Sequence, residues 1–166
     1  MSKKDSKDEF VEKIATWLKD FLEKKYPDYT VEVISRPGTL DKFENEKIKT
    51  VDDVGLLNFS PEILGILENK TTKKIELVLV ESEIKAYGVK DIGKMLCWCK
   101  LAKPKIAIMT SKIGLSAHVH KMINHGGKDE ILSFNEQKIK TFRWNVDKEE
   151  IDKLTITPRE DIDFFD

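Results

Sequence analysis

The sequence is poor in the features that mark secreted and membrane proteins. Its 166 residues contain two cysteines, Cys97 and Cys99, too few for the disulfide framework of a small secreted domain. No apolar run approaches the roughly 18 residues that a membrane-spanning helix needs, and the first eight residues are polar and charged rather than apolar. We therefore expect a cytoplasmic protein without a signal peptide and without a membrane partner.

Several catalytic signatures are also missing. The chain has no GxxxxGK[ST], no GxGxxG after a strand, no HExxH and no GxSxG, so nucleotide hydrolysis, dinucleotide binding, zincin and serine-hydrolase chemistry lack support. Two residues that are two positions apart on a helix point in nearly opposite directions. A zinc site built from Cys97, Cys99, His118 and His120 is therefore not expected.

The residues that are present fit one compact α/β (α+β) domain, since 40% are hydrophobic and 36% are charged. A capping-box signature at Ser6 opens an amphipathic helix to about residue 25. Strands are expected over residues 30–35, 63–67, 75–80, 105–110 and 137–144, and further helices over residues 91–101 and 113–125. The pattern predicts a central mixed sheet flanked by helices over residues 1–144, followed by an acidic extension over residues 145–166.

The end of the strand that starts at Ile75 carries the main functional signal. Its first residues are apolar on both faces, and the alternation then places Glu81, Glu83 and Lys85 on one face. Such charges are costly to desolvate unless they pair or bind an ion. The cluster is therefore either a structural salt bridge or a site for a hard cation such as Mg2+ or Mn2+.

A third acid is expected from the preceding strand. The polar turn over residues 68–73 is short, so the two strands should pair as an antiparallel hairpin. The start of the first strand then lies near the end of the second, which places Glu62 beside Glu83 and Lys85. Asp52 remains a further acidic candidate, and Glu81 a second carboxylate on the same strand.

Pro61-Glu62, a spacer of about twenty residues and Glu83-Ile84-Lys85 after an apolar strand resemble the motif of the PD-(D/E)xK nuclease superfamily. The expected order of elements is similar to the αβββαβ core of its restriction-endonuclease-like fold. The resemblance implies that Glu62, Glu83 and the Ile84 carbonyl hold Mg2+ (or Mn2+), and that Lys85 positions the attacking water. Several branches of the family carry a glutamine and a tyrosine on the next helix, where this chain has Lys94 and Trp98.

Charge is segregated along the chain although the formal net charge is −1. Residues 84–143 contain twelve Lys and Arg against four acids, whereas residues 145–166 contain three basic and eight acidic residues. A positive region beside an acidic cluster suits a protein that draws in a phosphate backbone, and a lysine-rich solvated surface gives the same count. The candidate nucleic-acid contacts are Lys90, Lys94 and Lys112.

Two functions follow from these patterns. The first is a Mg2+-dependent endonuclease that hydrolyses phosphodiester bonds in DNA, with RNA as an alternative substrate, catalytic residues Glu62, Glu83 and Lys85, and a homodimeric assembly. Its restriction, repair or junction-processing context is an analogy of fold. The second is a non-catalytic nucleic-acid-binding or assembly protein that retains the nuclease fold.

Overall fold

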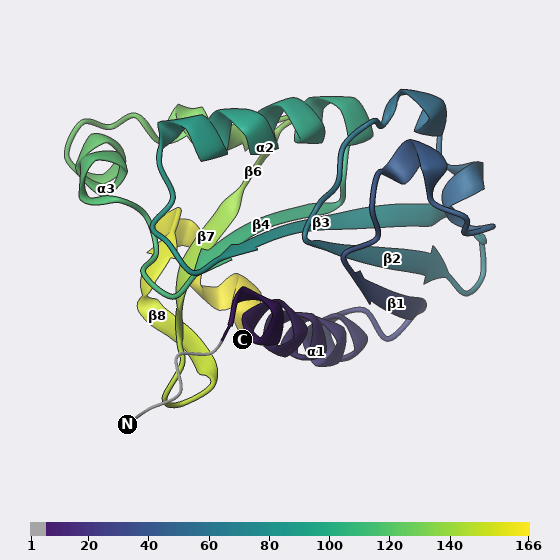
Figure 1. The fold of residues 1–166 in the computed structure, drawn as a ribbon, viewed down its shortest axis with the longest axis horizontal. Helices are drawn as coiled ribbons and strands as arrows, with labels where there is room; N and C mark the ends of the chain where they lie inside the picture. The colour runs from purple at the N-terminus through teal and green to yellow at the C-terminus, as the bar shows by residue number, and fades with distance from the viewer. Residues whose placement is uncertain (1–5) are drawn as a thin grey trace.

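The computed structural model describes residues 6–166, which form a mixed six-stranded sheet with helices on both faces (Figure 1). The order across the sheet is β1-β2-β3-β4-β7-β8. The expectation of an α+β domain with a central mixed sheet is thus confirmed. The strands of this sheet are β1 (Tyr29–Ser35), β2 (Ile63–Asn69), β3 (Ile75–Glu83), β4 (Ile106–Ser111), β7 (Lys140–Asn145) and β8 (Glu150–Thr157).

The strand β3 divides the sheet into two halves of different pairing. On one side β1, β2 and β3 form an antiparallel meander, with Ile63 opposite Val80 in the β2–β3 hairpin. On the other side β3, β4 and β7 run parallel, and Glu83 lies opposite Ser111. The connection from β3 to β4 runs through α2 (Val89–Ala102), as a parallel crossover requires. The sequence-based prediction of the hairpin is confirmed.

The helix α1 (Lys7–Lys25) covers one face of the sheet and α2 covers the other (Figure 1). Ser6 caps α1, because its hydroxyl accepts from the Glu9 backbone N–H while the Glu9 carboxylate accepts from the Ser6 backbone N–H. This reciprocal pair satisfies two backbone donors that the first turn leaves free. The predicted capping box and the predicted extent of the first helix are both confirmed.

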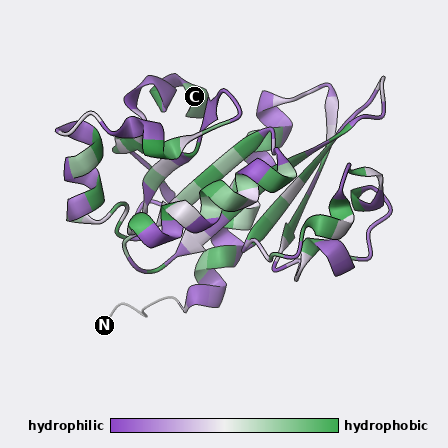
Figure 2. Cartoon of the chain, turned by 90° about the horizontal axis from the view of Figure 1, so that it is seen from above, coloured by the Kyte–Doolittle hydropathy of each residue, from purple (hydrophilic) through white to green (hydrophobic). Residues whose placement is uncertain are grey.

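Two apolar cores follow from this layering. Leu77 and Leu79 of β3 face α2, whereas Val78 and Val80 face α1, as the alternation of a strand requires. Figure 2 shows the central strands in the colours of apolar residues beneath a helix that alternates between polar and apolar positions. Residues 77–80 of β3 are therefore buried on both faces, which confirms the prediction of a strand covered on two sides.

Several elements differ from the sequence-based expectation. The helix expected from residue 113 begins four residues later, as α3 (Ala117–Asn124), with Ser116 as its N-cap. The strand expected over residues 137–144 is two strands, β6 (Gln137–Lys138) and β7. β6 leaves the main sheet to pair with β5 (Ser133–Phe134). The single residue between β6 and β7, Ile139, is apolar and buried, so the sequence gives no sign of this change of partner.

The acidic segment after residue 144 continues the same sheet. It supplies β8, which pairs antiparallel with β7, and the short helix η5 (Arg159–Phe165). Ile156 of β8 is fully buried, and Phe165 packs against the aromatic rings of α1 and β7. In residues 6–166 no helix is long and apolar enough to cross a membrane.

Candidate functional site

The carboxylates predicted as a site gather where β2 begins and β3 ends. Glu62 directly precedes β2, and Glu83 is the last residue of β3. The Glu62 backbone N–H donates to the Glu81 Oε1 atom at 3.2 Å, one residue beyond the Ile63–Val80 pair. The antiparallel register thus brings Glu62 to the end of β3, as predicted from the short turn.

A lysine that no sequence pattern singles out joins the two acids. The Lys7 Nζ atom lies 2.5 Å from the Glu62 Oε1 atom and 2.6 Å from the Glu83 Oε1 atom. The Oε1 atoms of Glu62 and Glu83 therefore lie no more than about 5.1 Å apart, the sum of these two distances. Burial acts to lower the pKa of Lys7, but the hydrogen bonds to Glu62 and Glu83 outweigh it, so the pKa of Lys7 is raised. The ammonium stays charged between the two carboxylates.

Glu81 is the buried acid of the cluster, with 3% of its surface exposed. Its Oε1 atom accepts from the Glu62 backbone, and its Oε2 atom accepts from the Lys94 Nζ atom of α2 at 2.8 Å. Burial raises the pKa of Glu81, and the Lys94 hydrogen bond opposes that rise. Both Glu81 oxygens are thus engaged in holding the start of β2 and the first half of α2 together.

Lys94 is itself held by the side chain that follows it one turn later. Its Nζ atom lies 4.7 Å from the centre of the Trp98 ring, which stacks on Phe59 with 4.8 Å between the ring centres. A cation above an aromatic face is attracted by the ring quadrupole. Lys94, predicted as a nucleic-acid contact, is therefore part of the support of the acid cluster.

Lys85 does not join the acids. β3 ends at Glu83, and Ile84 and Lys85 lie in a bend where strand alternation no longer holds. Within the part of the chain that the structure describes, exposed Lys85 makes no hydrogen bond or ion pair. Ile84 is 40% exposed beside Glu83. The structure therefore brings Glu62 and Glu83 together and leaves Lys85 at the rim.

The other two predicted nucleic-acid contacts lie around the same edge of the sheet. The Lys112 backbone N–H donates to the Glu83 carbonyl at 3.2 Å, and its Nζ atom lies 5.4 Å from the centre of the Phe10 ring. Lys90 is exposed in the first turn of α2. These lysines come from separate elements, since Lys90 lies on α2 and Lys112 directly follows β4.

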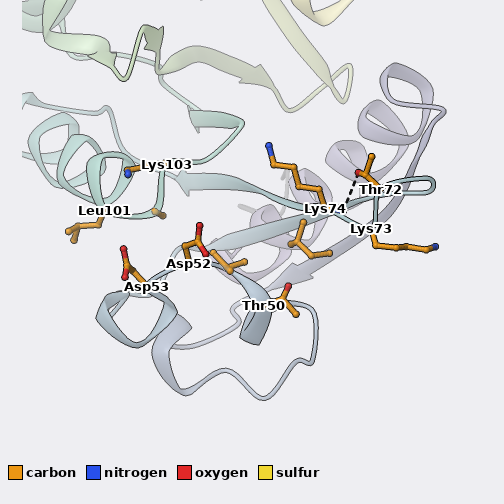
Figure 3. A pocket seen from close by; sticks show the side chains of 11 residues that line it. Thr50, Asp52, Asp53, Thr72, Lys73, Lys74, Leu101 and Lys103 are labelled. Atoms are coloured by element: carbon orange, nitrogen blue, oxygen red, sulfur yellow. Dashed lines mark hydrogen bonds between the residues drawn. The ribbon is translucent and has the colours of Figure 1, made fainter.

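Asp52 lies far from this cluster. It lines a cavity of about 470 Å3 together with Ile75, the first residue of β3 (Figure 3). The eight residue-to-residue steps from Ile75 to Glu83 span about 26 Å at ~3.3 Å per step. Asp52 and its neighbour Asp53 therefore belong to the opposite end of the sheet, beside the end of α2.

The described residues, 6 to 166, contain no group of three or more His, Cys, Asp or Glu side chains placed to hold a metal ion. Cys97 is exposed on α2 and Cys99 is buried, and burial raises the pKa of Cys99 to about 12. The two thiols thus point apart, as their spacing on a helix predicts. Among residues 6 to 166, Glu62 and Glu83 are the side chains whose oxygens converge at the acid cluster and could share a cation.

The oxygens of Glu62 and Glu83 nevertheless suit a hard divalent cation. They converge on one positively charged group, the Lys7 ammonium, which stands where such an ion would be shared. Mg2+ is commonly held by one or two carboxylates, with water and substrate phosphate completing its shell. The donor set fits Mg2+ or Mn2+ provided that Lys7 gives up its place.

Comparison with known proteins identifies no similar sequence or structure. The chain matches no family model, and neither the curated proteins nor the solved structures give a significant match.

Proposed function

We propose that the protein is a metal-dependent endonuclease that hydrolyses phosphodiester bonds in DNA at the Glu62–Glu83 site. The observation that carries the proposal is the convergence of two carboxylate oxygens, from neighbouring strands, on a single cationic group at an open end of the sheet. The side chains of Glu62 and Glu83 are 22% and 30% exposed. They are accessible to a substrate but partly shielded, which strengthens their interaction with a cation.

Glu62 and Glu83 would hold Mg2+ or Mn2+, with the Ile84 carbonyl as the third ligand implied by the family resemblance. When bound, such an ion supplies an activated water and offsets the charge that develops on the phosphate. The protein contributes the fixed separation of the two carboxylates. Glu81 secures that separation, because it accepts from the Glu62 backbone while sharing the β3 backbone with Glu83.

The lysines at the rim supply the attraction for a polyanion. Lys85 and Lys90 are exposed near the acids, and Lys112 is joined to Glu83 through the backbone. Positive charge beside a metal site raises the local concentration of a phosphate backbone. In this proposal Lys85 meets the phosphate at the rim as the substrate arrives. RNA shares the same backbone chemistry and is the alternative substrate.

The order of elements supports a restriction-endonuclease-like fold. α1, the meander β1-β2-β3, α2 and β4 follow the αβββαβ order of the PD-(D/E)xK superfamily, and the acids lie on the second and third strands. A homodimer would let two such sites address the two strands of a duplex. Lys94 and Trp98 occupy the places of the glutamine and tyrosine found in several branches, and here they support Glu81.

The ion-paired state of the cluster favours a second candidate function. Because Lys7 and Lys94 already neutralise the acids, the same residues would suit a non-catalytic nucleic-acid-binding or assembly protein that retains the fold. Binding would then rest on the exposed lysines, while the acids would serve the stability of the sheet. The two functions differ in whether loss of Glu83 abolishes a reaction.

The test is metal-dependent cleavage of plasmid, linear, branched and single-stranded DNA and of RNA, with Mg2+, Mn2+ or a chelator. Glu62→Gln and Glu83→Gln should each lower the rate at least ~100-fold, since a metal site supplies several kcal/mol and each 1.36 kcal/mol is tenfold. Glu23→Gln is the control because Glu23 is exposed on α1, far from the site. If no substrate is cut although DNA binds with a steep salt dependence, the binding function replaces the endonuclease.

A further inference from the structure

The position of Lys7 is fixed more firmly than that of an ordinary surface lysine. It is the first residue of α1, directly after the Ser6 cap, and Phe10 one turn later is fully buried. The cap and the buried ring hold the start of the helix against the sheet. The Lys7 backbone is therefore anchored beside the acids while its flexible stem remains free to turn.

The Lys7 ammonium uses the same oxygens that a divalent cation needs. It contacts the Oε1 atom of Glu62 and the Oε1 atom of Glu83 at hydrogen-bonding distance. An ion that bridged these same two oxygens at about 2.1 Å would occupy the space in which the ammonium now stands, where the two cations would overlap and repel. Metal and ammonium therefore exclude each other at this site.

Lys85, the lysine that the sequence motif selects, stands outside this competition. It lies in the bend after β3, exposed and without an ion pair among the described residues. Its removal leaves the contacts of Glu62 and Glu83 unchanged. Substitution of Lys7 should therefore change the metal affinity, whereas substitution of Lys85 should not. This difference is expected from the structure and not from the sequence motif.

We infer that Lys7 is a built-in competitor of the metal, which closes the Glu62–Glu83 site until a divalent cation displaces its ammonium. This inference rests on the proposed function only in the identity of the metal site. The Lys7 side chain is 36% exposed, so the displaced ammonium can turn toward solvent without unfolding α1. Occupancy by metal is then governed by the metal concentration together with the Lys7 contacts.

The experiment measures Mn2+ affinity from the electron paramagnetic resonance signal of free Mn2+, with no nucleic acid present. Lys7→Gln should bind Mn2+ roughly 10-fold more tightly than the wild type, the order expected for a partly exposed pair of ionic contacts. Lys7→Arg keeps the charge and should bind like the wild type. Lys85→Gln and the control Lys19→Gln, exposed on the same helix, should leave the affinity unchanged.

The outcomes of Mn2+ binding and of nucleic-acid cleavage together distinguish this inference from the proposed function. Equal or weaker Mn2+ binding by Lys7→Gln, with circular dichroism showing an intact fold, overturns the competition, as does the absence of Mn2+ binding in every variant. Tighter binding by Lys7→Gln with no cleavage of any nucleic acid supports the competition and overturns the endonuclease. Cleavage that requires Glu83, with equal Mn2+ affinity in the wild type and Lys7→Gln, supports the endonuclease and overturns the competition.

Discussion

At the scale of single residues, the acids at the start of β2 and the end of β3 are matched by lysines from the helices. Glu81 pairs with Lys94 of α2, and Glu62 pairs with Lys7 of α1. Leaving any of these carboxylates buried and unpaired would be costly. The pairs are separated by 13 and 55 residues along the chain, so they form only when the helices dock on the sheet.

The ion pair at the start of β3 gives a prediction for acid stability. Burial acts to raise the pKa of Glu76, but hydrogen bonds from Lys105 and Tyr29 outweigh it, so its pKa lies below the ordinary value of 4.5. A carboxyl whose folded pKa is lowered stabilises the folded state above its unfolded pKa, and this contribution is lost as the pH falls through the folded pKa. The wild type should therefore lose stability below about pH 4.5 partly through Glu76.

Glu76→Gln should reduce that loss. Urea unfolding followed by circular dichroism between about pH 5 and pH 3 would measure the free energy of unfolding in both proteins. Glu23→Gln, at an exposed position of α1, is the control and should keep the wild-type pH dependence. If the free energy of unfolding of Glu76→Gln fell with pH in parallel with that of the wild type, the Glu76–Lys105 pair would make no contribution to the pH dependence of stability.

The sequence predicts the acids of the candidate site better than its lysines. Glu62 and Glu83 follow from the hairpin register, because a short turn fixes which residues face each other. Lys85 is displaced because β3 ends at Glu83 and the alternation that placed it is lost. Lys7 has no local signal at all, since its contact with Glu83 joins residues 76 positions apart.

At the scale of elements, the strands and helices with strong periodicity are predicted with small errors at their ends. α1, β1, β2, β3, α2 and β4 all lie within a few residues of their expected positions. β8 is not predicted, because its apolar residues Ile151, Leu154 and Ile156 do not alternate regularly with the polar ones. Such an edge strand forms because β7 offers it a partner, which is a property of the sheet and not of the segment.

Close contact between α1 and the hairpin depends on a missing side chain at Gly65. A Cβ atom there would lie 2.8 Å from the Val78 Cβ atom and 3.3 Å from the Leu22 Cδ1 atom of α1. Gly65→Ala should therefore destabilise the protein by about 1–3 kcal/mol through overpacking. The measurement is the midpoint of urea unfolding by circular dichroism.

Gly93 provides the matched control for this substitution. It lies on the exposed side of α2, and an added Cβ atom would meet no atom within 4 Å. Gly93→Ala should stabilise the protein by roughly 0.5–1 kcal/mol, because alanine loses less backbone entropy in a helix. If both substitutions shifted the midpoint in the same direction, the packing argument for Gly65 would be contradicted.

At the scale of the whole molecule, the first helix and the C-terminal segment meet on one face of the sheet. Phe165 lies 5.6 Å from Phe21 of α1 and 5.1 Å from Phe142 of β7, measured between ring centres. Phe164 extends the cluster with 5.7 Å to Phe21. The acidic C-terminal segment therefore completes the apolar core between α1 and the sheet.

Phe165→Ala should lower the free energy of unfolding by about 2 kcal/mol, less than for a fully buried ring because Phe165 is half-buried. The loss should appear equally in circular dichroism and in tryptophan fluorescence, because Trp17 and Trp98 lie in the two cores on opposite faces of one sheet. Two separated transitions would instead show that the C-terminal segment unfolds on its own.

The turn that joins β2 to β3 lies at the far end of both strands from Glu62 and Glu83. Its residues 70 to 74 are exposed, and polar, exposed loop tips tolerate inserted sequence. An affinity tag or a fluorescent domain placed between Thr71 and Thr72 would leave both chain ends and the carboxylates untouched. The protein can therefore be tethered to a solid support with its acidic edge directed into solution, a geometry suited to single-molecule work.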